Sequence, residues 1–396
     1  MSEAILSFLL EYKYILIFYA FIIALLIIYR KKIDVQSKII FLIRTKLGLA
    51  WMDKYSAKFK EWIILLGYIG MGVGFIGMFF ISYTLIKNIY DLITIPSTVS
   101  GVSLVLPGIN VPGLGVLPFW HWLLSIFFIA IVHEFSHGIV ARAHKVEVKN
   151  TGIVFFGPII GAFVEPNENK LLKEKDTIQY SILAAGAFSN ILLGLVALLL
   201  LSFIFAPLQQ TMVEPIGFTF DKYYNENLPF AQQKIAAGTI INSLDHNPTL
   251  TFQEFSDSLT CKKPNDKITI TTNESKSYTI TLAENPDDKE KPFLGIQEIR
   301  NEFKIKEKYT SGMWSLAYYA TDTISTFLRW LFILSLGIGL FNLLPLPIVD
   351  GGRMVQVFLH KLKGPKDGEK RYRQISLFFL LILILTLIFP LILKLF

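Results

Sequence analysis

A five-residue motif places two imidazoles and a carboxylate inside an apolar stretch. Positions 133–137 read HEFSH, with apolar residues on both sides. On a helix, His133 and His137 lie four residues apart and share one face, so both can bind one metal ion. Glu134 follows the first of them and can act as general base toward a metal-bound water. The motif therefore predicts a catalytic zinc site.

The alternative is a chance match. The pattern H-E-x-x-H fixes only three positions, and such patterns occur by chance in long soluble chains. Here the motif lies in a segment apolar enough to cross a membrane, where every ionisable residue is costly and needs a specific reason. The apolar surroundings therefore favour the functional explanation.

Long apolar runs dominate the chain, which has 396 residues, 53% hydrophobic residues and a mean hydropathy of +0.50. A helix needs ~20 apolar residues to cross a ~30 Å hydrocarbon core. Six runs predict a polytopic α-helical membrane protein with about six transmembrane helices. They are Tyr12–Tyr29, Trp62–Leu85, Phe119–Ala141, Tyr180–Phe205, Met313–Leu344 and Ile375–Leu395. We expect the fifth to break near Gly337 and Gly339.

Basic residues predict the orientation of these helices. Lysine and arginine gather in the loops at 30–60, 142–175 and 361–373. These loops fall on one side of a six-span chain, which the positive-inside rule assigns to the cytoplasm. We expect a multi-pass protein of the cell membrane with its N-terminus and residues 209–308 outside. The net charge of +7 then reflects topology and not nucleic-acid binding.

Residues from about Gln209 to Lys308 differ from the rest because they are polar and contain short β-rich runs. Alternating apolar residues predict strands at Gly238–Leu244, Lys267–Thr272, Ser277–Leu282 and Leu294–Gln297. Apolar residues at helical spacing predict a helix at Thr251–Leu259, with Thr251 and Glu254 as a capping box. We expect a small α+β extracytoplasmic domain at residues 207–308. Its single cysteine, Cys261, cannot form an internal disulfide.

The order of these elements resembles a PDZ domain. A helix expected at Pro229–Ala237, a strand starting at Gly238 and a turn at Asn247-Pro248 correspond to the middle of that fold. A PDZ domain binds an extended peptide or a chain end along a sheet edge. The alternative is a β-rich domain that only spaces or caps the membrane part.

The segment Val146–Pro166 is too short and too rich in glycine and proline to span a membrane. It predicts a membrane-associated β-hairpin of two short apolar strands around Gly157 and Pro158. Irregular backbone at membrane depth must be satisfied by protein or by a water-filled cavity. The strand edge could pair with an extended substrate segment, or the hairpin could be a plain connection, and the sequence leaves both open.

A catalytic zinc takes three protein ligands and keeps one position open, so the two histidines need a partner. Asp350 is the best candidate, because Pro345 and Pro347 break the fifth helix just before it and the glycine pair after it permits a tight turn. An Asp-Gly pair alone would predict only a turn. The other histidines are expected to be solvated or interfacial. They are His121, His144, His246 and His360.

Taken together, the two motifs resemble the paired signature of the site-2 protease family of intramembrane zinc metalloproteases. That family combines H-E-x-x-H in one span with N-x-x-P-x-x-x-x-D-G in a later one, and here the second motif runs from Asn342 to Gly351. A PDZ-like insert between the motifs is also usual there. The resemblance covers about residues 119–352. It implies that Asn342 holds the substrate backbone or the developing oxyanion.

A third element of the family, Gly-x-x-x-Asn, is similar to Gly186 through Asn190, although Ala187 stands where proline is commoner. The resemblance places Asn190 among the catalytic residues. A lone asparagine in a helix could instead bond a neighbouring helix.

The resemblance implies a Zn²⁺ enzyme for regulated intramembrane proteolysis that cuts the transmembrane segments of protein substrates in the lipid bilayer. Its metal ligands would be His133, His137 and Asp350, toward the cytoplasmic side. The implied domain order is N-terminal helices at 1–118, the two halves of the protease core at 119–206 and 309–396, and the PDZ-like domain at 207–308. Two alternatives are an inactive homologue that acts as a PDZ-type membrane adaptor and a metal transporter. The intact Glu134 argues against the first, and the lack of internal repeats argues against the second.

Overall fold

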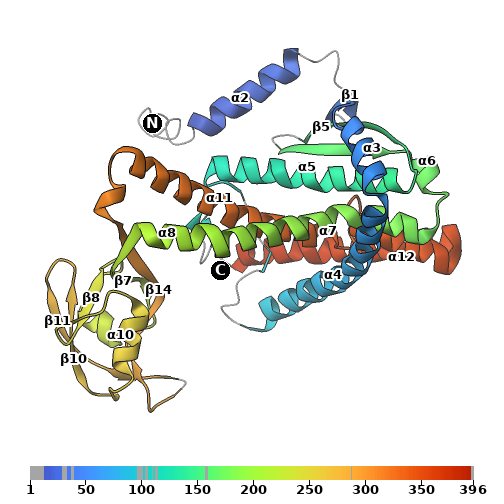
Figure 1. Ribbon diagram of the computed structural model, residues 1–396. Helices are drawn as coiled ribbons and strands as arrows, with labels where there is room; N and C mark the ends of the chain where they lie inside the picture. The colour runs from blue at the N-terminus through green and yellow to red at the C-terminus, as the bar shows by residue number, and fades with distance from the viewer. Residues whose placement is uncertain are drawn as a thin grey trace. The chain divides into compact units, whose positions relative to one another are not determined.

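The structure is a computed structural model, shown in Figure 1. It describes residues 13–28, 34–36, 40–95, 101–102, 106–108, 110–111, 115–156, 159–286 and 288–393. The chain divides into two compact units. One comprises the described residues up to Leu200 and from Thr326 onward, and the other is Leu201–Ser325.

Five helices within the described ranges are long and apolar enough to cross a membrane. They are α4 (Lys60–Thr94), α5 (Phe119–Ala143), α7 (Asp176–Leu200, extended by a π-helical turn at Leu201–Phe205 and by α8 at Ala206–Met212), α11 (Gly312–Asn342) and α12 (Asp350–Leu393). These lengths and compositions fit a multi-pass helical membrane protein. The first predicted span corresponds to the shorter helix α2 (Lys13–Ile28), and its predicted ends, Tyr12 and Tyr29, lie outside the described residues.

Two predicted helix boundaries are wrong. Helix α11 is not broken at Gly337 or Gly339 but continues to Asn342. Helix α12 begins at Asp350 and not at Ile375, with a kink at Gly364, where φ is +77°. The apolar-run criterion missed the first part of α12 because that part is polar, from Lys361 to Arg373.

Helix α7 lies at the centre of the helical unit, where it packs against α4, α5 and α12. Small residues allow the close approach of α4: a Cβ added at Gly74 would lie 3.1 Å from the Ala184 Cβ, and one at Gly70 would lie 3.0 Å from the Phe188 ring. Close packing through small residues is the usual means by which membrane helices associate, because lipid provides no hydrophobic drive between them.

A four-stranded antiparallel sheet lies beside α5 (Figure 1). Its order is β1 (Asp34–Gln36), β2 (Ile40–Thr45), β5 (Val148–Phe156) and β6 (Ile159–Pro166). The pairing of β5 with β6 confirms the predicted hairpin, whose expected turn at Gly157-Pro158 lies outside the described residues. Strands β1 and β2 were not predicted, because residues 30–60 were assigned to a basic loop.

Arg44 ties this sheet together across its strands. Its guanidinium bonds Glu165 of β6 at 3.0 Å and Asp34 of β1 at 2.5 Å. The hydrogen bond from Arg44 lowers the pKa of the Glu165 carboxyl below its usual value. Short elements surround the sheet and the helical core. They are α3 (Leu49–Lys58), α6 (Glu168–Leu171), and a hairpin of β3 (Asn110–Val111) and β4 (Gly115–Val116).

The second unit is built on a six-stranded antiparallel sheet with its own core. The sheet order is β11 (Ser277–Thr281), β10 (Lys267–Thr272), β8 (Ile241–Leu244), β7 (Val213–Tyr223) and β14 (Ile296–Ile305), with β9 (Asn247–Pro248) paired to β8. The remaining elements are α9 (Pro229–Gln232), α10 (Phe252–Leu259), a 3₁₀ turn at Glu307–Tyr309, and the pair β12 (Ala283–Glu284) and β13 (Pro292–Phe293). Phe218, Phe220 and Phe255 are among its fully buried side chains.

The predicted elements of this unit are found with changed limits. Thr251 caps α10 by accepting a hydrogen bond from the Glu254 backbone N–H at 3.2 Å, whereas the Glu254 carboxylate accepts from the Leu250 N–H at 2.8 Å. The helix expected at Pro229–Ala237 is only four residues long. The longest strand, β7, was missed because Pro215 and Gly217 interrupt its apolar alternation.

Candidate metal centre

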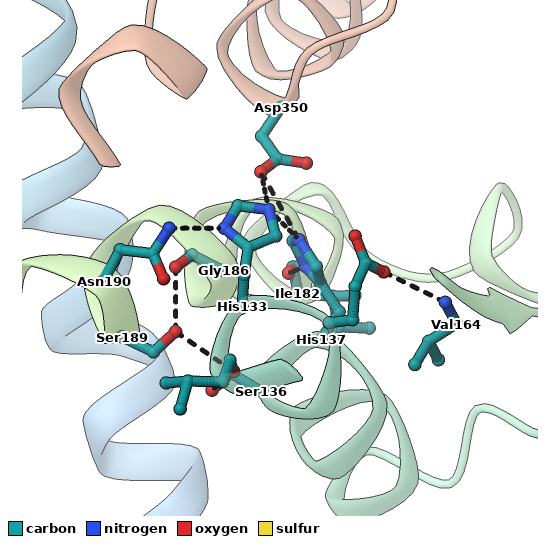
Figure 2. Close-up of polar contacts among 11 residues, drawn as sticks. His133, Ser136, His137, Val164, Ile182, Gly186, Ser189, Asn190 and Asp350 are labelled. Carbon is teal, nitrogen blue, oxygen red and sulfur yellow. Dashed lines mark hydrogen bonds and ion pairs between the residues drawn. The ribbon is translucent and has the colours of Figure 1, made fainter. Parts of the chain in front are cut away.

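Two histidine rings from α5 face each other in the interior of the helical unit. His133 and His137 are each 9% exposed, and their Nε2 atoms lie 3.2 Å apart. The rings share one face because they are one helical turn apart, as the spacing predicted. Figure 2 shows both rings directed toward the carboxylate of Asp350.

Asp350 supplies the third side chain of the cluster. Its Oδ2 atom lies 3.1 Å from Nε2 of His133 and 3.4 Å from Nε2 of His137. Asp350 is the first residue of α12 and follows a seven-residue connection from the end of α11, residues 343–349. The two sequence motifs are therefore brought together in space, as predicted.

The glycine pair after Asp350 is required for a different reason from the one expected. Gly351 and Gly352 lie inside the first turn of α12, not in a tight turn of their own. A Cβ at Gly351 would overlap the carbonyl oxygen of Leu343, and one at Gly352 would overlap that of Leu346. The pair thus allows the connection to fold back onto the helix that carries the third ligand.

Helix α7 contacts the sides of the rings that face away from Asp350. His137 Nδ1 lies 2.7 Å from the carbonyl oxygen of Ile182, and His133 Nδ1 lies 3.0 Å from the side-chain amide of Asn190 (Figure 2). Gly186 lies between these two contacts. A Cβ there would be 2.6 Å from His133 Nε2 and closer still to His137 Nε2. Only glycine fits at this position.

Glu134 extends from α5 toward the sheet. Its Oε2 atom accepts a hydrogen bond from the backbone N–H of Val164 in β6 at 3.0 Å. A strand N–H points within the plane of its sheet, and among the strands that the structure describes β6 pairs with β5 alone. Glu134 therefore lies at the free edge of β6.

The cluster suits a metal ion. The three ligand atoms of His133, His137 and Asp350 all lie within 4.8 Å of one another. The buried Asp350 Oδ2 accepts no hydrogen bond of acceptable geometry, although both rings are near it. Lone pairs that converge in this way without satisfying one another fit a shared cation. Two imidazoles and a carboxylate match a catalytic zinc set with one open position, and no other group of this kind occurs among the residues that the structure describes.

Asn342 does not join the cluster. It is the last residue of α11 and is half-buried. Within the described part of the chain, its side-chain amide makes no hydrogen bond to any of the three ligands. Asn190, by contrast, contacts His133 directly and is fully buried.

The four remaining histidines, predicted to be solvated or interfacial, are not part of the cluster. His144 is half-buried, with Nε2 3.5 Å from the Ser181 hydroxyl. His360 forms an ion pair with Glu369 at 3.3 Å. His246 is exposed, and His121 is half-buried at the start of α5.

Sequence reasoning missed two parts of the site. The carbonyl of Ile182 and the amide of Val164 are backbone groups, so no side-chain pattern identifies them. Gly186 and Asn190 could be recognised as a motif, but the motif did not predict that Asn190 contacts His133.

Comparison with known proteins finds one family profile and several similar proteins. Residues 121–387 match the profile of peptidase family M50. An uncharacterized protein of Methanocaldococcus jannaschii is 26% identical over 336 residues, which are 82% of this chain and 79% of that protein. The zinc metalloprotease RasP of Oceanobacillus iheyensis is 37% identical over 79 residues, 17% of this chain and 19% of RasP. Protease RseP of Photorhabdus luminescens is 39% identical over 44 residues, 11% of this chain and 20% of RseP.

The profile covers more than half of the chain and includes the three clustered side chains His133, His137 and Asp350. The same residues carry the two motifs of the site-2 proteases. The chain therefore belongs to peptidase family M50, the site-2 protease family.

Proposed function

We propose that this protein is an intramembrane zinc endopeptidase that hydrolyses peptide bonds in or near the transmembrane segments of other membrane proteins. The observation that carries the proposal is the cluster of His133, His137 and Asp350 on α5 and α12, two helices long and apolar enough to span a membrane. Membership in family M50 and similarity to a zinc metalloprotease support it.

Each residue of the cluster has a role in this proposal. His133, His137 and Asp350 hold the zinc, which when bound supplies a Lewis acid that polarises the scissile carbonyl and acidifies water. Glu134 takes a proton from the attacking water as its oxygen bonds to the carbonyl carbon. Glu134 then delivers this proton to the amine nitrogen as the C–N bond breaks. The products are a carboxylate and an amine.

The free edge of β6 is the proposed substrate platform. A transmembrane helix hides its backbone amides in internal hydrogen bonds, so the segment to be cut must first unwind. An unwound segment can add to an exposed sheet edge as an extra strand. Because Glu134 is bonded to Val164 at this edge, a strand added there lies beside the general base. The bond between Glu134 and this edge favours a substrate platform over a plain connecting hairpin.

Asn342 is the proposed contact for substrate backbone. It ends α11, eight residues before Asp350, and its side chain makes no hydrogen bond within the described ranges. Because the amide nitrogen of this side chain donates to no other described group, it can donate a hydrogen bond to a substrate carbonyl or to the developing oxyanion.

The second unit is proposed as an extracytoplasmic PDZ-like domain, with the metal centre toward the cytoplasm. Its six-stranded sheet with α10 against it has a core of its own, and the positive-inside rule applied to the basic loops supports this orientation. The domain would bind a chain end or exclude substrates with bulky outer parts. Deleting residues 207–308 should allow cleavage of untrimmed substrates, and continued resistance of those substrates would reject the exclusion role.

The decisive test of the enzyme is Glu134→Gln in the full-length protein, with a membrane-anchored reporter as substrate. The amide keeps the shape of the side chain but cannot take a proton, so we expect retained zinc and loss of cleavage. Glu147→Gln is the matched control, because Glu147 is exposed and pairs with Lys170 at 3.2 Å. Undiminished cleavage by Glu134→Gln would reject the assignment of the base.

A further inference from the structure

Three groups on α7, each one helical turn from the next, face the two imidazoles. They are the carbonyl of Ile182, the bare Cα of Gly186 and the side chain of Asn190. The Ile182 carbonyl and the Asn190 side chain lie two helical turns apart on α7, on either side of Gly186. Each ring thereby has its own partner on its Nδ1 side (Figure 2).

The partner of Nδ1 decides whether a ring can bind a metal through Nε2. A neutral imidazole carries one proton, and the nitrogen without it is the ligand. The Ile182 carbonyl can only accept, so at 2.7 Å it holds the proton of His137 on Nδ1 and leaves Nε2 free. The Nε2 atoms of both rings point to Asp350, so His133 needs an acceptor in the same place.

Asn190 offers that acceptor. Its Nδ2 lies 3.0 Å from His133 Nδ1, while its Oδ1 is buried and has no hydrogen-bond partner within the described residues. A half-turn of the amide exchanges the two atoms, which occupy nearly the same space. Because Oδ1 accepts no hydrogen bond from another described residue, this rotation breaks none at the oxygen.

We propose that Asn190 is a positioning residue: its amide oxygen accepts a hydrogen bond from the Nδ1–H of His133, so that Nε2 is directed at the metal. With Ile182 on His137, α7 thereby fixes the proton and the rotation of both rings. This role differs from contact with substrate, because Asn190 is 0% exposed.

Helix α11 holds Asn190 in place. The hydroxyl of Ser335 donates a hydrogen bond to the Asn190 backbone carbonyl at 2.7 Å. Gly339, one turn further along α11, lets the two helices approach, because a Cβ there would lie 3.1 Å from the Asn190 Cβ. The asparagine is therefore fixed from both sides, as a group that orients a ligand must be.

The test measures zinc affinity of the full-length protein in detergent, by competition with a chelating dye. Groups that orient metal-bound histidines typically contribute about 10–100-fold to metal affinity, so we expect a loss of that size for Asn190→Ala. Asn190→Asp should bind close to wild type, because a carboxylate accepts the Nδ1–H as the amide oxygen does. Ser189→Ala is the matched control, since it removes hydrogen bonds to the backbone carbonyls of Gly186 and Val132 without removing a contact to either ring.

The Asp variant keeps the test decisive even if Asn190→Ala does not fold. Loss of zinc from folded Asn190→Asp would show that Nδ1 of His133 needs a hydrogen-bond donor and not an acceptor. Equal zinc affinities of wild type and Asn190→Ala would show that Nδ1 needs no partner on α7. Either result overturns the positioning role. The inference rests on the proposed function for its metal. A wild-type protein that binds no zinc would overturn the proposed function itself, whereas the comparison among zinc-binding variants tests Asn190 alone.

Discussion

The carboxylate of Glu134 accepts a hydrogen bond from the backbone N–H of Val164 at 3.0 Å, which joins the H-E-x-x-H helix to the edge strand of the sheet. The two residues are thirty positions apart in the sequence. The contact fixes the side chain proposed as general base and marks the point on β6 where an extended substrate would meet it. The bond thus links the sheet to the helix that carries His133 and His137.

Replacing Val164 with proline should impair cleavage more than it impairs folding. Proline removes the N–H that bonds Glu134, and an edge strand tolerates proline where the N–H faces away from its neighbour. We expect the rate of reporter cleavage to fall by about tenfold or more, because general acid–base catalysis contributes about 10²–10⁴-fold and the variant loses the bond that positions the base. Zinc content should stay at the wild-type level.

Val164→Ala separates the backbone effect from the side chain. Alanine keeps the N–H and loses only part of the packing of a half-buried side chain, at about 1 kcal/mol. Its cleavage rate should remain near wild type. Equal rates for the proline and alanine variants would mean that the bond to Glu134 has no part in catalysis.

Gly186→Ala should abolish zinc binding. The added methyl group would lie 2.6 Å from His133 Nε2 and closer to His137 Nε2, and neither ring can move away without losing its Nδ1 partner. Gly337→Ala is the control, since nothing lies within 4 Å of a Cβ there in the middle of α11. That variant should fold and bind zinc normally, with a stability equal to or up to about 1 kcal/mol above wild type. The measurement is the zinc content of both purified variants. Zinc retained by Gly186→Ala would contradict the close contact between Gly186 and the two rings.

Acid should weaken the four-stranded sheet through Glu165. Its pKa is lowered by the hydrogen bond from Arg44, so the pair contributes stability above the ordinary value of 4.5, and that contribution is lost as the pH falls through the lowered pKa. With both side chains about one-third exposed, the contribution is ~0.5 kcal/mol. The Tm should therefore drop more between pH 7 and pH 4 in wild type than in Glu165→Gln. Equal drops would show that the pair does not stabilise the fold.

Ile348→Gly should raise the thermal stability. Ile348 has a φ of +79° and is 96% exposed, so the branched side chain strains the backbone without packing. A left-handed conformation costs about 1–2 kcal/mol for a residue with a Cβ, and glycine removes this cost. Glycine also loses more conformational entropy on folding, which lowers the gain in stability by about 0.5–1 kcal/mol. The net gain should be about 1 kcal/mol, seen as a higher Tm. Val349→Gly, at a half-buried neighbour, should lower the Tm, and a similar fall in Ile348→Gly would contradict the strain.

Much of the metal centre could be predicted from the sequence because its ligands are side chains with fixed chemistry. His133 and His137 define a helix face, and Asp350 is an acidic residue among apolar and proline residues near a helix end. The contacts that orient these ligands could not be predicted, because the carbonyl of Ile182 and the amide of Val164 look the same in every sequence.

The long apolar helices could be predicted from hydropathy, whereas the polar helical segment and the short strands could not. The long apolar runs located the five helices, but α12 also includes a polar segment that an apolar criterion excludes. Gly337 and Gly339 suggested a break, yet inside a membrane the backbone must keep its hydrogen bonds, so α11 stays helical. Strands β1 and β2 are short, and β2 pairs with β5, which is about a hundred residues away, a pairing that no local pattern records.

The proposed function depends above all on His133, His137 and Asp350 holding the metal that drives peptide cleavage. The most direct measurement is cleavage of a membrane-anchored reporter by the purified protein in liposomes, before and after chelation, for wild type and Asp350→Ala. Wild type should cleave, lose activity on chelation and regain it with zinc, while Asp350→Ala should neither bind zinc nor cleave. Cleavage by Asp350→Ala, or by chelated wild type shown to be free of zinc, would contradict it.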